Sequence, residues 1–186
     1  MIFSSTEDNV LFLYPYYSLD VKVDEMSKQV YQVFKKGWYV SQYFPGIEAH
    51  LCEALEKYFA RGEMQKLKIA ITVMPSHTQG KHGEQLMMMA SALVSKYDWI
   101  DASCLIQRII EKKKSTEGGI REVNAHLQTL GLVAEPDKGV DVYIVLDDIA
   151  TTGSSLEAAK QLLVANGVDA SRVIKIAIAK TMYDDF

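Results

Sequence analysis

The amino-acid sequence predicts an α/β fold, in which a central, mostly parallel sheet is covered by helices on both faces. Apolar runs of strand length alternate with helical patterns along the last two-thirds of the chain. One of these runs, residues 140–146, is apolar at every position except Asp141. Such a run is typical of a strand buried on both faces of a parallel sheet. The chain has 186 residues, of which 48% are hydrophobic, so we expect residues 1–186 to form a single domain with a sizeable core.

The first part of the chain, residues 1–64, is expected to form a mainly helical N-terminal portion. Residues 10–17 are apolar and aromatic and should form a strand or a segment tucked against the core. Residues 23–36 carry apolar side chains at helical spacing. Pro45 is expected to open a second helix over residues 46–59, because proline is favoured in the first turn of a helix.

The rest of the chain, residues 65–186, should contain the alternating strands and helices of the sheet. A buried strand over residues 67–74 is expected to end before Pro75, and a polar loop over residues 76–83 follows it. The further elements that we expect, in chain order, are a helix over 84–96, a strand over 100–106, a basic stretch over 111–119, a helix over 120–130, the strand over 140–146, a helix over 156–165 and a last strand over 173–179.

The stretch LDDIATTGSS, residues 146–155, carries the clearest chemical signal. In a parallel sheet, ligands bind beyond the carboxyl ends of the strands, where the next helix begins. The backbone N–H groups and hydroxyls of residues 149–155 suit an anion, and the absence of lysine favours a phosphate monoester over a nucleoside triphosphate. Asp147 and Asp148 are acceptors when ionised and suit a vicinal diol. Together these features indicate a ribose 5-phosphate site.

Two other interpretations of this stretch remain open at the sequence level. In the first, Asp147 and Asp148 form a solvated turn, and the following hydroxyl residues cap a helix. In the second, the pair belongs to a carboxylate metal site of the kind found in phosphoryl-transfer receivers. That site needs a further acidic residue at the end of another strand, and the sequence does not point to one.

Residues 143–155, YIVLDDIATTGSS, resemble the signature of type I phosphoribosyltransferases, which bind 5-phosphoribosyl 1-pyrophosphate (PRPP). Ala150 stands where a larger aliphatic residue is usual. Residues 67–95, residues 112–132 and the last helix and strand are similar in order and spacing to ComF-type phosphoribosyltransferase-like proteins. Within them, KHGEQ at residues 81–85 resembles the Arg-Gly-x-Asn-Gln segment of that group, and residues 115–130 resemble its glycine-containing loop and helix. The zinc ribbon that is common at the front of such proteins is missing.

The resemblance implies a type I phosphoribosyltransferase-like fold, with a PRPP-binding core over residues 65–186 and an N-terminal hood over residues 1–64. It also implies Mg²⁺ bound together with PRPP, bridging the pyrophosphate and the ribose hydroxyls near Asp147 and Asp148. The implied roles are catalysis and ribose binding for Asp147 and Asp148; 5-phosphate binding for Ile149, Ala150, Thr151, Thr152, Gly153, Ser154 and Ser155; pyrophosphate binding for Ser76, His77, Thr78 and Lys81; and a lid containing Lys112, Lys113 and Lys114.

The function that the resemblance implies is transfer of a 5-phosphoribosyl group to a nitrogenous base with release of pyrophosphate. A non-catalytic sensor of PRPP or nucleotides and a ComF-like protein of nucleic-acid metabolism are the alternatives. The aromatic residues of the N-terminal portion are expected either to grip the acceptor base or to pack the core or a homodimer interface. These residues are Tyr14, Tyr16, Tyr17, Trp38, Tyr39, Tyr43 and Phe44.

Composition and charge narrow the expected partners and location. The formal net charge is −4, so nucleic acid is not expected as a partner. No apolar stretch approaches the roughly 20 residues that span a membrane. The N-terminus does not have the pattern of a signal peptide, and the separated Cys52 and Cys104 suggest no disulfide framework and are expected to be buried thiols. We therefore expect a cytoplasmic protein.

Overall fold

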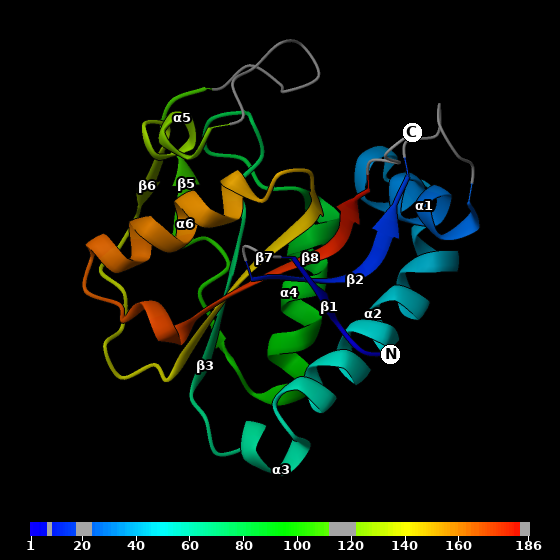
Figure 1. Ribbon diagram of the computed structural model, residues 1–186, viewed down its shortest axis with the longest axis horizontal. Helices are drawn as coiled ribbons and strands as arrows, with labels where there is room; N and C mark the ends of the chain where they lie inside the picture. The colour runs from blue at the N-terminus through cyan, green and yellow to red at the C-terminus, as the bar shows by residue number, and fades with distance from the viewer. Residues whose placement is uncertain (7–8, 18–23, 112–121, 183–186) are drawn as a thin grey trace.

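The computed structural model describes residues 1–6, 9–17, 24–111 and 122–182. Figure 1 shows a central sheet with helices on both sides, as the sequence predicts. The strand order of the main sheet is β1-β2-β8-β7-β3-β4, and every neighbouring pair is parallel except β1 and β2. The expectation of an α/β fold with a mostly parallel sheet is confirmed. The strands are β1 (Ser4–Ser5), β2 (Val10–Tyr16), β3 (Ile69–Val73), β4 (Ile100–Asp101), β7 (Val142–Ala150) and β8 (Val173–Thr181).

The central strands are apolar because both of their faces are buried. Successive side chains of a strand point to opposite faces. On β7, Ile144 and Leu146 pack in one hydrophobic core, whereas Tyr143 and Val145 pack in the other. All five residues of β3 are buried. A continuous apolar run thus serves two cores at once.

Helices cover the two faces in separate groups (Figure 1). One face packs against α1 (Glu25–Val30), the π-helix η1 (Tyr31–Lys36), α2 (Val40–Tyr58) and α4 (Glu84–Tyr97). The other face packs against α6 (Ser154–Ala165) and a separate two-stranded antiparallel sheet. The remaining elements are α3 (Arg61–Met64), the strands β5 (Ile106–Arg108) and β6 (Leu130–Leu132) of this second sheet, α5 (Val123–Leu127) and the 3-10 helix η3 (Ala170–Arg172).

The helix predicted over residues 23–36 is divided into an α-helical and a π-helical part. Asp24 caps it, because its side chain accepts hydrogen bonds from the backbone N–H groups of Met26 and Ser27, both at 3.1 Å. The π-helical turn then runs to Lys36 and ends at Gly37, whose φ of 66° is left-handed.

Several predicted boundaries are wrong. α2 begins at Val40, so Pro45 lies inside the helix and does not open it. The strand expected over residues 100–106 is two short strands in different sheets, β4 and β5. The helix expected over residues 120–130 is only the five-residue α5 within the described part of the chain. Cys52 is buried as expected, but Cys104 is exposed.

The most consequential difference concerns the end of β7. The strand does not stop at Leu146 but continues to Ala150, so the acidic residues and the next two lie inside it. Asp147 pairs with Ala177 and Ala150 pairs with Lys180 of β8. Because β8 is equally long, the ladder extends beyond the apolar run, and only residues 151–153 connect β7 to α6. We call this connection loop 151–153.

None of the helices within the described ranges is both long and apolar enough to cross a membrane.

Candidate functional site

A cavity of about 720 Å³ opens at the carboxyl ends of the parallel strands. This volume falls in the range of small-molecule sites. Residues from the ends of β2, β3, β7 and β8 meet there with residues of η1, of β5, of α5 and of the start of α4. The lining residues are Tyr16, Tyr31, Phe34, Lys35, Met74, Pro75, Ser76, His77, Gly83, Gln85, Leu86, Arg108, His126, Asp147, Asp148, Ile149, Thr151, Thr152, Gly153, Ser155 and Thr181.

Asp147 lies at the inner side of the cavity. Its Oδ2 accepts a hydrogen bond from the hydroxyl of Ser155 over 3.2 Å, and its Oδ1 accepts one from the backbone N–H of Asp148 over 2.9 Å. Burial, and then repulsion from the charge of Asp148, raise the pKa of Asp147 to about 7, against the opposing influence of Lys35. A carboxyl with such a pKa is unusual for a solvated turn and common at functional sites.

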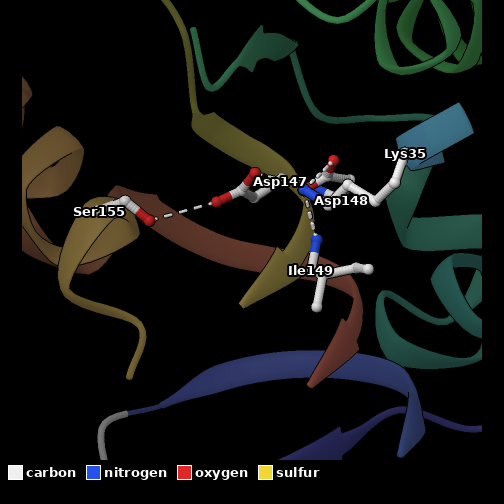
Figure 2. Close-up of polar contacts among 5 residues, drawn as sticks. All are labelled: Lys35, Asp147, Asp148, Ile149 and Ser155. Carbon is white, nitrogen blue, oxygen red and sulfur yellow. Dashed lines mark hydrogen bonds and ion pairs between the residues drawn. The ribbon is translucent and has the colours of Figure 1, made fainter. Parts of the chain in front are cut away.

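Asp148 is paired with a lysine that the sequence did not reveal. The Nζ atom of Lys35, on η1, lies 2.7 Å and 3.0 Å from the two carboxylate oxygens of Asp148. Burial by itself would lower the pKa of Lys35, but the charge of Asp148 and the hydrogen bond to it, helped by Asp147, raise the pKa above its ordinary value. Figure 2 shows the acidic pair, Asp147 and Asp148, between Ser155 on one side and Lys35 on the other.

Loop 151–153 has the backbone of an anion site. Gly153 has a φ of 78°, and a Cβ atom at this position would lie 3.1 Å from Cγ2 of Val10, so glycine is required for both reasons. The loop leads directly into the N-terminus of α6, where backbone N–H groups are available. Lys180 of β8 donates hydrogen bonds to the backbone carbonyl groups of Thr151 and Thr181 and holds the loop from behind.

The residues predicted for the 5-phosphate divide into two groups. Ile149, Thr151, Thr152, Gly153 and Ser155 line the cavity. Ala150 and Ser154 do not. Ala150 is buried in the core beneath α6 because its side chain points to the opposite face of β7, and the Ser154 hydroxyl lies 2.8 Å from that of Thr152.

The residues predicted for pyrophosphate are also brought only partly together. Ser76 and His77 line the cavity, whereas Thr78 and Lys81 are not among its lining residues. Lys81 instead closes the loop, because its carbonyl accepts a hydrogen bond from the Ser76 N–H over 2.8 Å. Lys112, Lys113 and Lys114 lie outside the described residues.

Arg108 is a site residue that the sequence reasoning missed. It lines the cavity although only 4% of its surface is exposed. Its Nε donates to the carbonyl of Ser76 over 3.1 Å, and one terminal nitrogen donates to the hydroxyl of Thr129. Within the described part of the chain no carboxylate forms an ion pair with it. Burial lowers its pKa, while the charge of Asp147 opposes that change. A buried cation without a paired anion is costly, so this position suits an anionic ligand.

Aromatic side chains of the N-terminal portion form a further part of the wall. Tyr16, Tyr31 and Phe34 line the cavity. Of the aromatic residues noted in the sequence, Tyr14 and Phe44 pack in the core, and Trp38 is 60% exposed. Packing in the core is thus confirmed for Tyr14 and Phe44, whereas a grip on the acceptor base stays a prediction for Tyr16.

Comparison with solved structures gives a distant likeness. No protein-family model matches the chain, and no curated protein matches it. Among solved structures, the chain is similar to a hypoxanthine phosphoribosyltransferase from Staphylococcus aureus, with 13% sequence identity. The match covers 67% of this chain and 70% of that chain, with a TM-score of 0.32.

The residues of the site are compatible with Mg²⁺ that arrives with a ligand. The described residues contain no group of three or more His, Cys, Asp or Glu side chains that would hold a metal ion by themselves. The acidic pair, however, presents carboxylate oxygens to an open cavity. Mg²⁺ keeps several waters and is commonly bound through one or two carboxylates and the phosphates of a substrate. This donor set therefore fits a ligand-borne magnesium ion.

Proposed function

We propose that the protein binds PRPP and transfers its 5-phosphoribosyl group to a nitrogenous base, with release of pyrophosphate. One observation carries this proposal. The acidic pair lines one cavity together with a lysine-free loop at the start of a helix and a buried arginine that has no ion-pair partner among the described residues. A phosphate monoester, a diol and a second anionic group, held in one cavity, match the chemistry of PRPP.

The 5-phosphate would bind at loop 151–153 and the first turn of α6. Gly153 lets the backbone approach closely, and the hydroxyls of Thr151, Thr152 and Ser155 add donors. The ribose hydroxyls would donate to Asp147 and Asp148, which are acceptors when ionised. Ser155 faces both groups, since it lines the cavity and donates to Asp147.

The leaving pyrophosphate would lie on the side of the cavity formed by Ser76, His77 and Arg108. The Arg108 guanidinium is already held there by the carbonyl of Ser76. A guanidinium binds phosphate oxygens through strong, charge-assisted hydrogen bonds. Magnesium bound with the ligand would add charge neutralisation of the pyrophosphate.

In the proposed reaction, the bond between C1 of the ribose and the pyrophosphate oxygen breaks, and its electron pair leaves with the pyrophosphate. The lone pair of the acceptor nitrogen forms the new bond to C1, and any proton on that nitrogen passes to water. The sugar carries positive charge as the bond breaks. Asp147 and Asp148, which would bind the ribose hydroxyls, would stabilise that charge electrostatically.

A second candidate is a non-catalytic sensor of PRPP or nucleotides. The Lys35–Asp148 ion pair favours it, because a resident cation reduces the negative charge that the acidic pair can offer to the sugar. A role in nucleic-acid metabolism, the third alternative, has no support from the net charge of −4.

The test of ligand binding is the melting temperature with and without PRPP and Mg²⁺. A ligand at 100 times its Kd adds about 2.7 kcal/mol to the free energy of unfolding. The double variant Asp147→Asn, Asp148→Asn should lose this stabilisation. Asp98→Asn is the matched control, because Asp98 is exposed, lies far from the cavity and has a left-handed backbone that asparagine tolerates. An unchanged response of the double variant would refute the ribose assignment.

Turnover separates the enzyme from the sensor. The protein would be incubated with PRPP, Mg²⁺ and a panel of purine, pyrimidine and pyridine bases, and pyrophosphate would be measured. Release that one class of base stimulates establishes transfer. Stabilisation by PRPP without release in the presence of any base establishes the sensor.

A further inference from the structure

The π-helix η1 brings three neighbouring side chains to one end of the cavity. Tyr31, Phe34 and Lys35 all line it. They belong to a six-residue π-helical segment, and π-helical turns are frequent at functional sites. Tyr16, from the end of β2, also lines the cavity and lies near enough to Lys35 to interact with it electrostatically. This end of the cavity therefore combines three aromatic rings with one ammonium group.

Lys35 and Arg108 are the two permanently cationic side chains among the described lining residues, and they occupy different places. Arg108 is bonded to Ser76, on the side proposed for pyrophosphate. Lys35 is bonded to Asp148 (Figure 2) and belongs to the same π-helix as Tyr31 and Phe34. Its side chain is 43% exposed, against 20% for Asp148. The ammonium is thus not locked in the core and has room to move toward a ligand.

The present partner of Lys35 conflicts with the proposed chemistry. A positive charge within contact distance of Asp148 offsets the negative charge that should stabilise the sugar as pyrophosphate leaves. Solvent screens part of this offset because Lys35 is partly exposed, but at contact distance some of it remains. An efficient reaction needs the ammonium to be drawn away from Asp148 or neutralised by another anion.

We propose that Lys35 selects an acidic acceptor, which is a flat nitrogen heterocycle bearing a carboxylate or similarly ionised oxygen. The anion of this acceptor replaces Asp148 as the ion-pair partner of Lys35. This inference rests on the proposed function. The ring of such an acceptor would pack against Tyr16, Tyr31 and Phe34, and its anion would meet the Lys35 ammonium. Asp148 is then freed for the sugar. A neutral heterocycle can use the aromatic wall but leaves Lys35 on Asp148, so the site discriminates by charge.

The experiment compares heterocycles that differ mainly in one carboxylate, nicotinic acid against nicotinamide and orotic acid against uracil. Each is added to protein, PRPP and Mg²⁺, and pyrophosphate release is measured. The variants are Lys35→Met and Lys36→Met. Lys36 is the matched control, because it is the next residue of η1 but contacts the rings of Tyr31 and Trp38 and does not line the cavity.

At least one of the two acids is expected to stimulate release about tenfold more strongly than its neutral partner does. A preference of about tenfold is the size of one charge-paired contact. Lys35→Met should abolish this preference, whereas Lys36→Met should keep it. Stabilisation of the parent and of Lys36→Met by PRPP alone reports on the proposed function separately.

The outcomes are distinguishable. If PRPP stabilises the parent but neutral bases are preferred, or no acid stimulates release, or Lys35→Met retains the acid preference, the inference about Lys35 is wrong while PRPP binding stands. If PRPP fails to stabilise the parent, the proposed function fails and this inference fails with it.

Discussion

The hydroxyl of Ser155 donates a hydrogen bond to Oδ2 of Asp147 over 3.2 Å. This contact joins the first turn of α6 to the end of β7, across the three residues of loop 151–153. The phosphate-type loop and the acidic pair are therefore one structural unit. A substitution at Ser155 should therefore affect the pKa of the Asp147 carboxylate as well as the binding of a phosphate.

Ser155→Ala should weaken PRPP binding in a pH-dependent manner. The hydroxyl stabilises the ionised form of Asp147, whose pKa is already about 7, so its removal raises that pKa further. Binding at pH 7 should fall about fivefold, as expected for one lost hydrogen bond to a charged group, and recover in part at pH 8.5. Ser154→Ala, which removes a hydroxyl outside the cavity lining, should bind as the parent does. Equal losses in the two variants would contradict this role.

Asp147→Asn should change the pH dependence of stability. The folded-state pKa of Asp147 is raised from 3.8 to about 7, so the folded protein holds a proton that the unfolded chain releases. Its stabilising contribution is full below pH 3.8 and is lost as the pH rises toward 7. Asparagine imitates the protonated form at every pH. The variant should be more stable than the parent by about 1–3 kcal/mol at pH 8 and similar to it at pH 4, as measured by urea unfolding. Parallel stability curves would refute the raised pKa.

The layers of the fold were predictable because burial of a strand on both faces requires a continuous apolar run, which can be recognised in the sequence. Strands β3 and β7 are apolar runs, and α4 and α6 carry apolar residues at helical spacing. The end of β7 was not predictable. Two aspartates disfavour a strand locally, and only the ladder to β8 extends the strand to Ala150. Tertiary pairing overrides local preference there.

The acidic pair and its loop were also predictable, because they are contiguous in sequence. The cations of the site were not. Lys35 and Asp148 are 113 residues apart, and no local pattern links them. Arg108 did leave one signal: it stands in the run LIQRII, residues 105–110, and a charged residue within an apolar run suggests a buried cation. Its partner Ser76 lies 32 residues away.

Gly153→Ala should both destabilise the protein and weaken ligand binding. The left-handed φ of 78° is unfavourable for alanine, and the new Cβ would crowd Val10 at 3.1 Å. We expect a loss of about 1–3 kcal/mol in the free energy of unfolding. Gly46→Ala is the control, since it lies in α2 with nothing within 4 Å of its added Cβ. It should stabilise the protein by about 0.5–1 kcal/mol. A neutral effect of Gly153→Ala would show that loop 151–153 can relax.

Arg108→Met should separate ligand binding from stability. Methionine keeps most of the apolar volume and removes a buried charge that has no ion-pair partner among the described residues, and replacing buried charges by apolar groups is often close to neutral. The free energy of unfolding should change by no more than about 1 kcal/mol. Binding of pyrophosphate and PRPP should fall strongly, because the proposed anion contact is gone, whereas ribose 5-phosphate should still bind.

Thr129→Val should show the opposite pattern. It removes the hydroxyl that accepts from Arg108 but leaves the guanidinium in the cavity wall. The buried donor then lacks its partner, which should destabilise the protein by about 1–2 kcal/mol while pyrophosphate still binds. Urea unfolding and calorimetric titration with pyrophosphate measure the two effects independently. If Arg108→Met binds pyrophosphate as the parent does and loses stability instead, Arg108 is a structural link between Ser76 and Thr129, and the anion site lies elsewhere in the cavity.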